Sequence, residues 1–423
     1  TVEQLLNDGW QFCKLPLGST LEDVSNAALQ AVDLPHDFLI ENENDLYKTT
    51  DAWYLRTLDV PESWCASCVL VRFDGVYMDC DVLLNGHIVC THHYGYTAFD
   101  VDLTGRLLVG RNTLAVHIRH QSPNSRWYSG AGIYRDVTLH VLPKRHIPLD
   151  GVYVTTTHEL ESWTMTIDTE LCGVKDNGVL THVLLDGDVP VCDVTVEAAG
   201  DHANAVMQVL SPKLWSPDAP NVYTLQTMLG NQVIRQNVGF RDLTFTTDRG
   251  LLVNGAPVKL HGVCLHHDLG CLGSAFHEKA MRRQLRAMRQ MGVNALRTSH
   301  NPPAKQVMDL CDELGIFVVD EAFDMWLRAK TPFDYARFFP TDMPSDVAAW
   351  VRRDRNHPSL LMWSIGNEIL DTHLDESAQQ VTCDLCENVR LHDPRGNAII
   401  TIGSNFMPWE GARKCADLVD AQG

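Results

Sequence analysis

Residues 293–323 read VNALRTSHNPPAKQVMDLCDELGIFVVDEAF. Its first and last parts, VNALRTSH and IFVVDEAF, read as strands, and IFVV is an apolar run typical of a strand that is buried on both faces. Between them, AKQVMDLCDELG has the spacing of an amphipathic helix, and Gly315 is a typical residue to end one. A strand, a helix and a second apolar strand predict a βαβ unit with parallel strands.

The same alternation extends in both directions from this unit. Upstream lie the strand VKLHGVC (258–264) and the helix HEKAMRRQLRAMRQMG (277–292), in which Met281, Leu285, Met288 and Met291 recur at three- and four-residue spacing. Downstream lie the helix 346–356, the strand SLLMWSIGNE (359–368), the helix 377–391, the strand NAIITIG (397–403) and the helix 409–420. A closed (β/α)8 barrel has eight such strands. We therefore expect residues 248–423 to form an incomplete TIM barrel with strands 1–5 and an open edge.

The residues before 248 lack a helical period. VLVRFDGVYMDCDVLLNGHIV (69–89) alternates apolar and polar residues, and its Asn85-Gly86 pair is a strong hairpin signal. Strands at this spacing predict a β-sandwich over residues 1–143. Residues 144–247 are again strand and turn, and about 100 residues is the size of an immunoglobulin-like sandwich. The expected fold is thus multidomain, β and α/β.

The composition excludes some classes of partner. The 423 residues carry a formal net charge of -20, which disfavours nucleic acid and anionic membranes and suits a neutral substrate. No apolar run approaches the roughly 18 residues of a membrane helix, and the N-terminus has no signal-peptide pattern. We therefore expect a cytoplasmic protein.

The 13 cysteines are scattered and odd in number, which fits a reducing compartment. A zinc site would need the pairs Cys65/Cys68 and Cys383/Cys386 to meet in the fold. The alternative is that the second pair lies on one face of a helix as small apolar residues.

Polar groups gather where the predicted barrel strands end, which is where barrel enzymes carry their functional groups. These strand-end residues are His266 and His267, then Arg297, Ser299, His300 and Asn301, then Asp320, Glu321 and Asp324, and finally Asn367 and Glu368. Four successive ends of this kind predict a site for a polar ligand.

The sequence resembles a known family at several ordered motifs. RDRNHPSLLMWSIGNE (353–368) is similar to the acid/base signature of glycoside hydrolase family 2, and the resemblance to the β-galactosidases is closer than that to the β-glucuronidases. The further landmarks are GWQF (9–12), LPHDF (34–38), WYSGAGIYRDV (127–137), LRTSHNPP (296–303) and VVDEAFDMW (318–326). The resemblance covers essentially the whole chain and implies a jelly-roll sugar-binding domain, an immunoglobulin-like sandwich and a barrel.

The resemblance also implies roles for single residues. It makes Glu368 the general acid/base and Asn367 a hydrogen-bond partner of the sugar 2-hydroxyl, a contact that strengthens in the transition state. It implies that His300 and His266 bind sugar hydroxyls, whereas the residues alone also allow structural histidines. Asp320 and Asp324 either bind sugar hydroxyls or hold Arg297 in place. Arg126, beside the motif 127–137, is a candidate to reach the barrel.

The sequence departs from the family pattern in two places. The large β-galactosidases carry a magnesium-binding Glu and His after strand 3, whereas the corresponding stretch here is DMWLRAK, so we expect no metal and no cofactor. The family's nucleophile ends strand 7. The glutamates after Glu368 are Glu376, Glu387 and Glu410, all expected in helices or connections. The expectation is a chain truncated before its nucleophile.

These inferences predict a retaining glycosidase for terminal β-D-galactosides that is inactive as this chain alone. The alternatives are a β-glucuronidase or other family 2 glycosidase, and a carbohydrate-binding remnant without catalysis. The expected partner is a β-galactoside oligosaccharide or glycoside, with neither nucleic acid nor membrane, and a homo-oligomer is compatible with the sequence.

Overall fold

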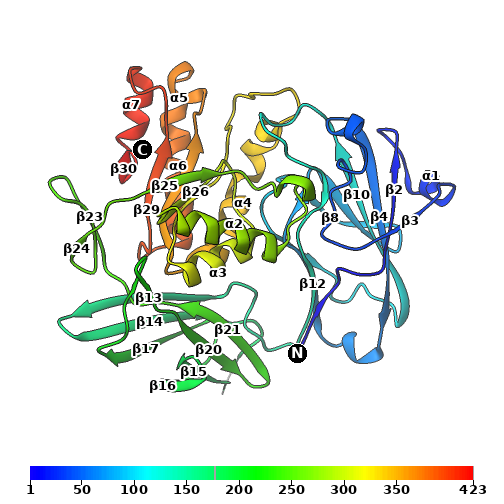
Figure 1. The fold of residues 1–423 in the computed structure, drawn as a ribbon. Coiled ribbons are helices and arrows are strands. Elements are labelled where there is room, and N and C mark those ends of the chain that lie inside the picture. Colours follow the sequence, from blue (N-terminus) through cyan, green and yellow to red (C-terminus); the bar gives the residue numbers. More distant parts are fainter. Residues whose placement is uncertain (176–177, 423) are drawn as a thin grey trace.

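The computed structural model describes residues 1–175 and 178–422. Figure 1 shows two β domains, blue to cyan and cyan to green, packed against a third part of parallel strands and helices in green to red. The predicted fold class is confirmed. No helix among the described residues has the length and apolarity to span a membrane.

The first domain is a sandwich of two antiparallel sheets around a continuous apolar core. One sheet has the order β1 (Val2–Leu5), β12 (Val137–Leu142), β5 (Cys68–Phe73) and β9 (Phe99–Asp102). The other has the order β3 (Gln30–Val32), β2 (Trp10–Leu15), β4 (Thr50–Val60), β10 (Gly110–His120), β7 (Cys80–Leu84) and β8 (His87–His92). Smaller elements are the pair β6 (Val76–Tyr77) and β11 (Gly132–Ile133), and α1 (Leu21–Ser25). The predicted hairpin turn is confirmed, because Asn85 and Gly86 join β7 to β8 with φ of +50° and +85°.

The second domain is a smaller antiparallel sandwich. Its sheets are β13 (Val152–Glu159), β14 (Ser162–Glu170) and β17 (His202–Leu210), facing β16 (Val189–Ala198), β15 (Gly178–Asp186), β20 (Tyr223–Leu229) and β21 (Gln232–Val238). In β14 and β20 buried residues alternate with half-buried or exposed ones, so each strand gives one face to the core. The short pair β18 (Trp215–Ser216) and β19 (Ala219–Pro220) and the sheet β22 (Leu243–Thr246), β23 (Gly250–Val253) and β24 (Ala256–Pro257) lead into the third part.

The third part is one parallel sheet with helices on its outer side. Its strands are β25 (Gly262–Leu265), β26 (Ala295–Thr298), β27 (Phe317–Glu321), β28 (Leu360–Asn367), β29 (Ile399–Gly403) and β30 (Ala421–Gln422). The count of five predicted strands is therefore wrong by one. The two-residue β30, which pairs with β29, is too short to give an apolar period.

The helices of this part are α2 (Glu278–Gln290), α3 (Lys305–Leu314), α4 (Phe339–Asp354), α5 (Asp371–Leu374), α6 (Ala378–His392) and α7 (Glu410–Ala416). Two details differ from the prediction. The helix predicted at 346 begins at Phe339, because Phe339 is buried against Phe323 and Tyr335. Met291, expected on the apolar face of α2, is 73% exposed because the helix has ended at Gln290.

The domain boundaries predicted at 143 and 247 fall between elements, after β12 and between β22 and β23. Both β domains make hydrogen bonds to the helices of the barrel part. From the first domain, Thr97 donates to Asp346 of α4 at 2.6 Å. From the second, Trp215 donates to the carbonyl oxygen of Asp312 in α3 at 2.9 Å.

Candidate active site

The carboxyl ends of the parallel strands meet a loop of the first domain, residues 124–129. Trp127 of that loop packs its ring against His266, with centroids 5.0 Å apart, and against His300, at 5.6 Å. The ring of His267 is 2.9 Å from the carbonyl oxygen of Ser129. The site is thus built from two domains, and Trp127 is a member that the sequence analysis did not select.

Glu368 is the first residue after β28, and its backbone is left-handed, with φ of +44°. Its N–H donates to the carbonyl oxygen of Gly403 at 2.8 Å. Its side chain is 36% exposed, and Nη1 of Arg126 lies 3.3 Å from Oε2. A carboxyl group in this position is open to a ligand and can exchange a proton with it.

Asn367 lies one residue earlier and has its amide group held on both sides. Nδ2 donates to Oδ1 of Asp324 at 2.8 Å, and Oδ1 accepts from Nη2 of Arg297 at 2.8 Å. An amide group has one further donor and one further acceptor site. Asn367 is therefore fixed in orientation and retains the capacity to bond a hydroxyl group.

Glu321 is the centre of a network that holds the predicted site residues. Its carboxylate bonds Nδ1 of His300 at 2.6 Å, accepts from Nε of Arg297 at 2.9 Å and accepts from Ser364 at 2.6 Å. The side chain is fully buried. Glu321 therefore positions His300 and Arg297, whereas the sequence analysis had considered Asp320 and Asp324 as the residues that hold Arg297.

Asp320 does not belong to the site, which corrects its prediction as a substrate-binding residue. Successive residues of a strand point to opposite faces. Glu321 faces the inside of the barrel, so Asp320 faces the helix layer, where it lies against Trp350, Arg353 and Asp354 of α4. Burial, together with the neighbouring Asp354, raises the pKa of Asp320 well above its ordinary value. Strand alternation places these two neighbours on opposite faces, but which of them faces the site depends on the tertiary structure.

Asp324 accepts three donors that converge from different parts of the chain. Arg126 holds both of its oxygens, at 2.7 and 3.1 Å, and Nζ of Lys330 lies 2.8 Å from Oδ1, which also receives Asn367. Burial alone would raise the pKa of Asp324, but the hydrogen bonds from Arg126 and Lys330 hold it below its ordinary value. Arg126 thus reaches the barrel, and Lys330, which the sequence analysis did not select, completes the cluster.

His266 contributes a neutral ring to the wall of the site. Its centroid is 5.4 Å from that of His300, at nearly a right angle. Burial lowers the pKa of His266, with a further contribution from His300. At neutral pH the ring therefore presents a nitrogen that can accept or donate a hydrogen bond.

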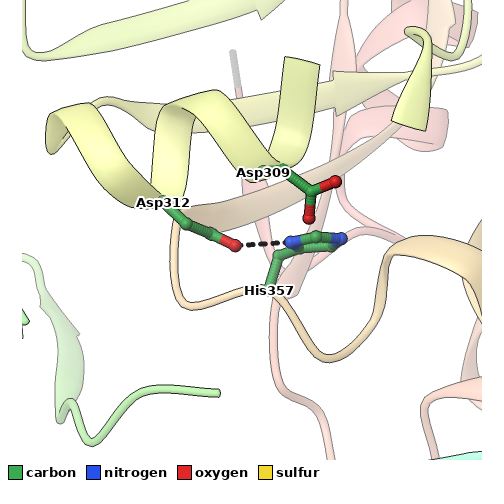
Figure 2. Close-up of side chains that lie close together, drawn as sticks. All are labelled: Asp309, Asp312 and His357. Carbon is green, nitrogen blue, oxygen red and sulfur yellow. Dashed lines mark hydrogen bonds and ion pairs between the residues drawn. The ribbon is translucent and has the colours of Figure 1, made fainter. Parts of the chain in front are cut away.

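A separate group of ligand-type side chains lies at the amino-terminal side of the sheet. In the part of the chain that the structure describes, Asp309 and Asp312 of α3 and His357, just before β28, have ligand atoms within 4.8 Å of one another (Figure 2). Nδ1 of His357 lies 2.6 Å from Oδ2 of Asp312, closer than two ligands of one ion usually lie. Burial would lower the pKa of His357, but Asp312 and then Asp309 raise it to about 9. In its protonated form, His357 makes a buried ion pair with Asp312.

The two cysteine pairs do not form a joint site. Cys65 and Cys68 lie in the first domain, whereas Cys383 and Cys386 lie in α6, where Cys386 is buried. This position agrees with the interpretation of Cys383 and Cys386 as small apolar residues on a helix.

Almost all of the chain is similar to a single family of proteins. Residues 3–143 match the sugar binding domain of glycosyl hydrolases family 2, residues 146–241 match its central domain, and residues 245–396 match its TIM barrel domain. The chain belongs to glycoside hydrolase family 2. The three matches follow the order of the three parts of the structure.

Individual relatives are similar over most of this chain. The beta-galactosidase BoGH2A of Bacteroides ovatus is 37% identical over 84% of the chain and 45% of its own length. A putative beta-glucuronidase of Formosa agariphila is 33% identical over 90% of the chain and 38% of its own length. A solved family 2 member from Bacteroides cellulosilyticus superposes with a TM-score of 0.91 at 30% identity, over 100% of this chain and 58% of that one. The chain thus spans less than half the length of these two curated relatives.

Proposed function

We propose that this protein is a glycosidase that cleaves terminal β-D-galactosides with retention of configuration, with Glu368 as its general acid/base. The observation that carries the proposal is the position of Glu368 at the carboxyl end of β28, partly exposed and beside Asn367 and Arg126. Glu368 would protonate the glycosidic oxygen and later activate water, while the amide group of Asn367 binds the sugar 2-hydroxyl.

A retaining glycosidase needs a second carboxyl about 5–5.5 Å from the first. Glu321 is fully buried and engaged by Arg297 and His300, so it cannot reach a sugar. Glu387 lies in α6, Glu410 begins α7, and Glu376 precedes α6; all three are exposed. We therefore propose that the nucleophile comes from outside these 423 residues.

The choice of galactosides over glucuronides rests on the motifs SIGNE (364–368) and DEAFDMW (320–326), which resemble the β-galactosidases more closely than the β-glucuronidases. The beta-galactosidase named above supports the same choice. The Formosa agariphila relative keeps β-glucuronidase as the second candidate.

The deciding experiment compares two substrates on the whole protein. We expect release of nitrophenol from nitrophenyl β-galactoside at least about tenfold faster than from nitrophenyl β-glucuronide, since each lost site interaction costs on the order of 1.4 kcal/mol or more. Proton NMR of the first-formed sugar reports retention as the β-anomer. Preference for the glucuronide would establish the second candidate, and binding of sugar without turnover would establish the carbohydrate-binding alternative.

A further inference from the structure

The peptide unit between Asn367 and Glu368 is held at both of its ends. Its N–H, from Glu368, donates to the carbonyl oxygen of Gly403 in β29 at 2.8 Å. Its carbonyl oxygen, from Asn367, accepts from Nζ of Lys330 at 2.8 Å. A strand supplies one partner and a side chain supplies the other.

Lys330 is placed for this contact by its own loop. The N–H groups of Lys330 and Thr331 both donate to Oδ2 of Asp334, at 2.7 and 2.9 Å, and Asp334 is fully buried. The Lys330 side chain is only 5% exposed. Burying an ammonium group is unfavourable unless it is paired and hydrogen-bonded, so this placement is specific.

The second bond of Lys330 joins the peptide to the rest of the site. Nζ also lies 2.8 Å from Oδ1 of Asp324, the oxygen that receives the amide of Asn367. One ammonium group therefore binds the backbone of Asn367 and the partner of its side chain. Glu368, which follows, has the left-handed backbone that residues other than glycine adopt uncommonly.

From this geometry we propose that Lys330 is a positioning residue of the catalytic machinery: it fixes the Asn367–Glu368 peptide and thereby aims the Glu368 carboxyl at the leaving group. The proposal rests on the proposed function. Lys330 acts through the backbone and through Asp324. Without it, the Asn367 carbonyl loses its partner, and the peptide is held only through the N–H of Glu368.

The test uses the whole protein and the variant Lys330→Met, which keeps a side chain of similar length and removes the charge and the hydrogen-bond donors. A misplaced Glu368 slows cleavage most when the leaving group needs a proton. We therefore expect kcat/KM for an alkyl β-galactoside to fall at least about tenfold more than kcat/KM for dinitrophenyl β-galactoside. Lys213→Met is the matched control, since it removes an exposed lysine–carboxylate pair in the second domain and should change neither value.

An equal loss on both substrates would show that Lys330 only supports the fold, and no loss would show that it is dispensable; either result overturns the proposal. If Lys330→Met does not fold, judged by circular dichroism, Lys330→Leu also removes the charge and the donors and is read by the same ratio of the two substrates. Inactivity of the unmodified protein would instead refute the proposed function.

Discussion

Glu368 is the residue whose replacement should leave a characteristic kinetic signature. In the whole protein, Glu368→Ala should slow hydrolysis of an alkyl β-galactoside by about 10²–10⁴-fold, the usual contribution of general acid catalysis. A dinitrophenolate leaving group needs little protonation, so cleavage of that substrate to the glycosyl-enzyme should change much less. Pre-steady-state release of dinitrophenol measures that step. Glu376→Ala removes an exposed glutamate outside the site and serves as the control. A uniform loss across leaving groups would mean that Glu368 is not the acid.

His357 makes a second prediction at the scale of single residues. Asp312 and Asp309 raise its pKa from 6.5 to about 9 against the effect of burial. A pKa that is raised in the folded state adds to the free energy of unfolding. This contribution is fully present below pH 6.5 and is lost as the pH rises through about 9. The loss should be on the order of 3 kcal/mol, since each pKa unit corresponds to about 1.36 kcal/mol.

Urea unfolding between pH 6 and pH 9.5 measures this contribution of His357 to the free energy of unfolding. The wild-type protein should lose apparent unfolding free energy across that window, and His357→Asn should be less stable at pH 6 with a flatter pH dependence. His87→Asn changes an exposed histidine of the first domain and should keep the wild-type slope. Identical slopes for His357→Asn and the wild type would contradict the assignment.

At the scale of elements, the end of α3 shows how the second domain constrains the barrel part. Gly315 caps α3 with φ of +69°, and a Cβ there would lie 2.3 Å from the carbonyl oxygen of Pro217. Gly292, after α2, has φ of +88° with open space around it. Gly292→Ala therefore adds backbone strain alone, of about 1–2 kcal/mol, whereas Gly315→Ala adds a clash with rigid backbone.

Thermal unfolding of the two variants separates these effects. We expect Gly315→Ala to lower Tm clearly more than Gly292→Ala does. Equal shifts in Tm would indicate that α3 and the loop at Pro217 can move apart without loss of stability.

At the scale of the whole molecule, the sheet of the third part ends in two open edges, β25 and β30. Every residue of β25 is exposed or half-buried, although its sequence is GVCL. Exposed strand edges with apolar side chains favour association between chains. We expect the 423 residues, produced by themselves, to associate and to show no glycosidase activity, because the second carboxyl would be absent.

Sedimentation velocity and an aryl β-galactoside assay on the purified 423-residue chain test this prediction. A monodisperse monomer would contradict the first part of the prediction. Turnover that vanishes in Glu368→Ala would contradict the second, and would place a nucleophile within these residues or in a partner chain.

The sequence by itself determined the fold class, the hairpin at Asn85–Gly86, the helix stop at Gly315 and the gathering of Asn367, His300, Arg297 and Asp324 at strand ends. These features follow from local periodicity, turn chemistry and the rule that parallel strands end at one edge. The tertiary structure alone decided that Glu321 rather than Asp320 faces the site, and that Lys330 and Trp127 complete it. The physical reason is that strand register and loop paths depend on contacts between residues far apart in the chain. Arg126 and Asp324, for example, are 198 residues apart in sequence and joined by two hydrogen bonds.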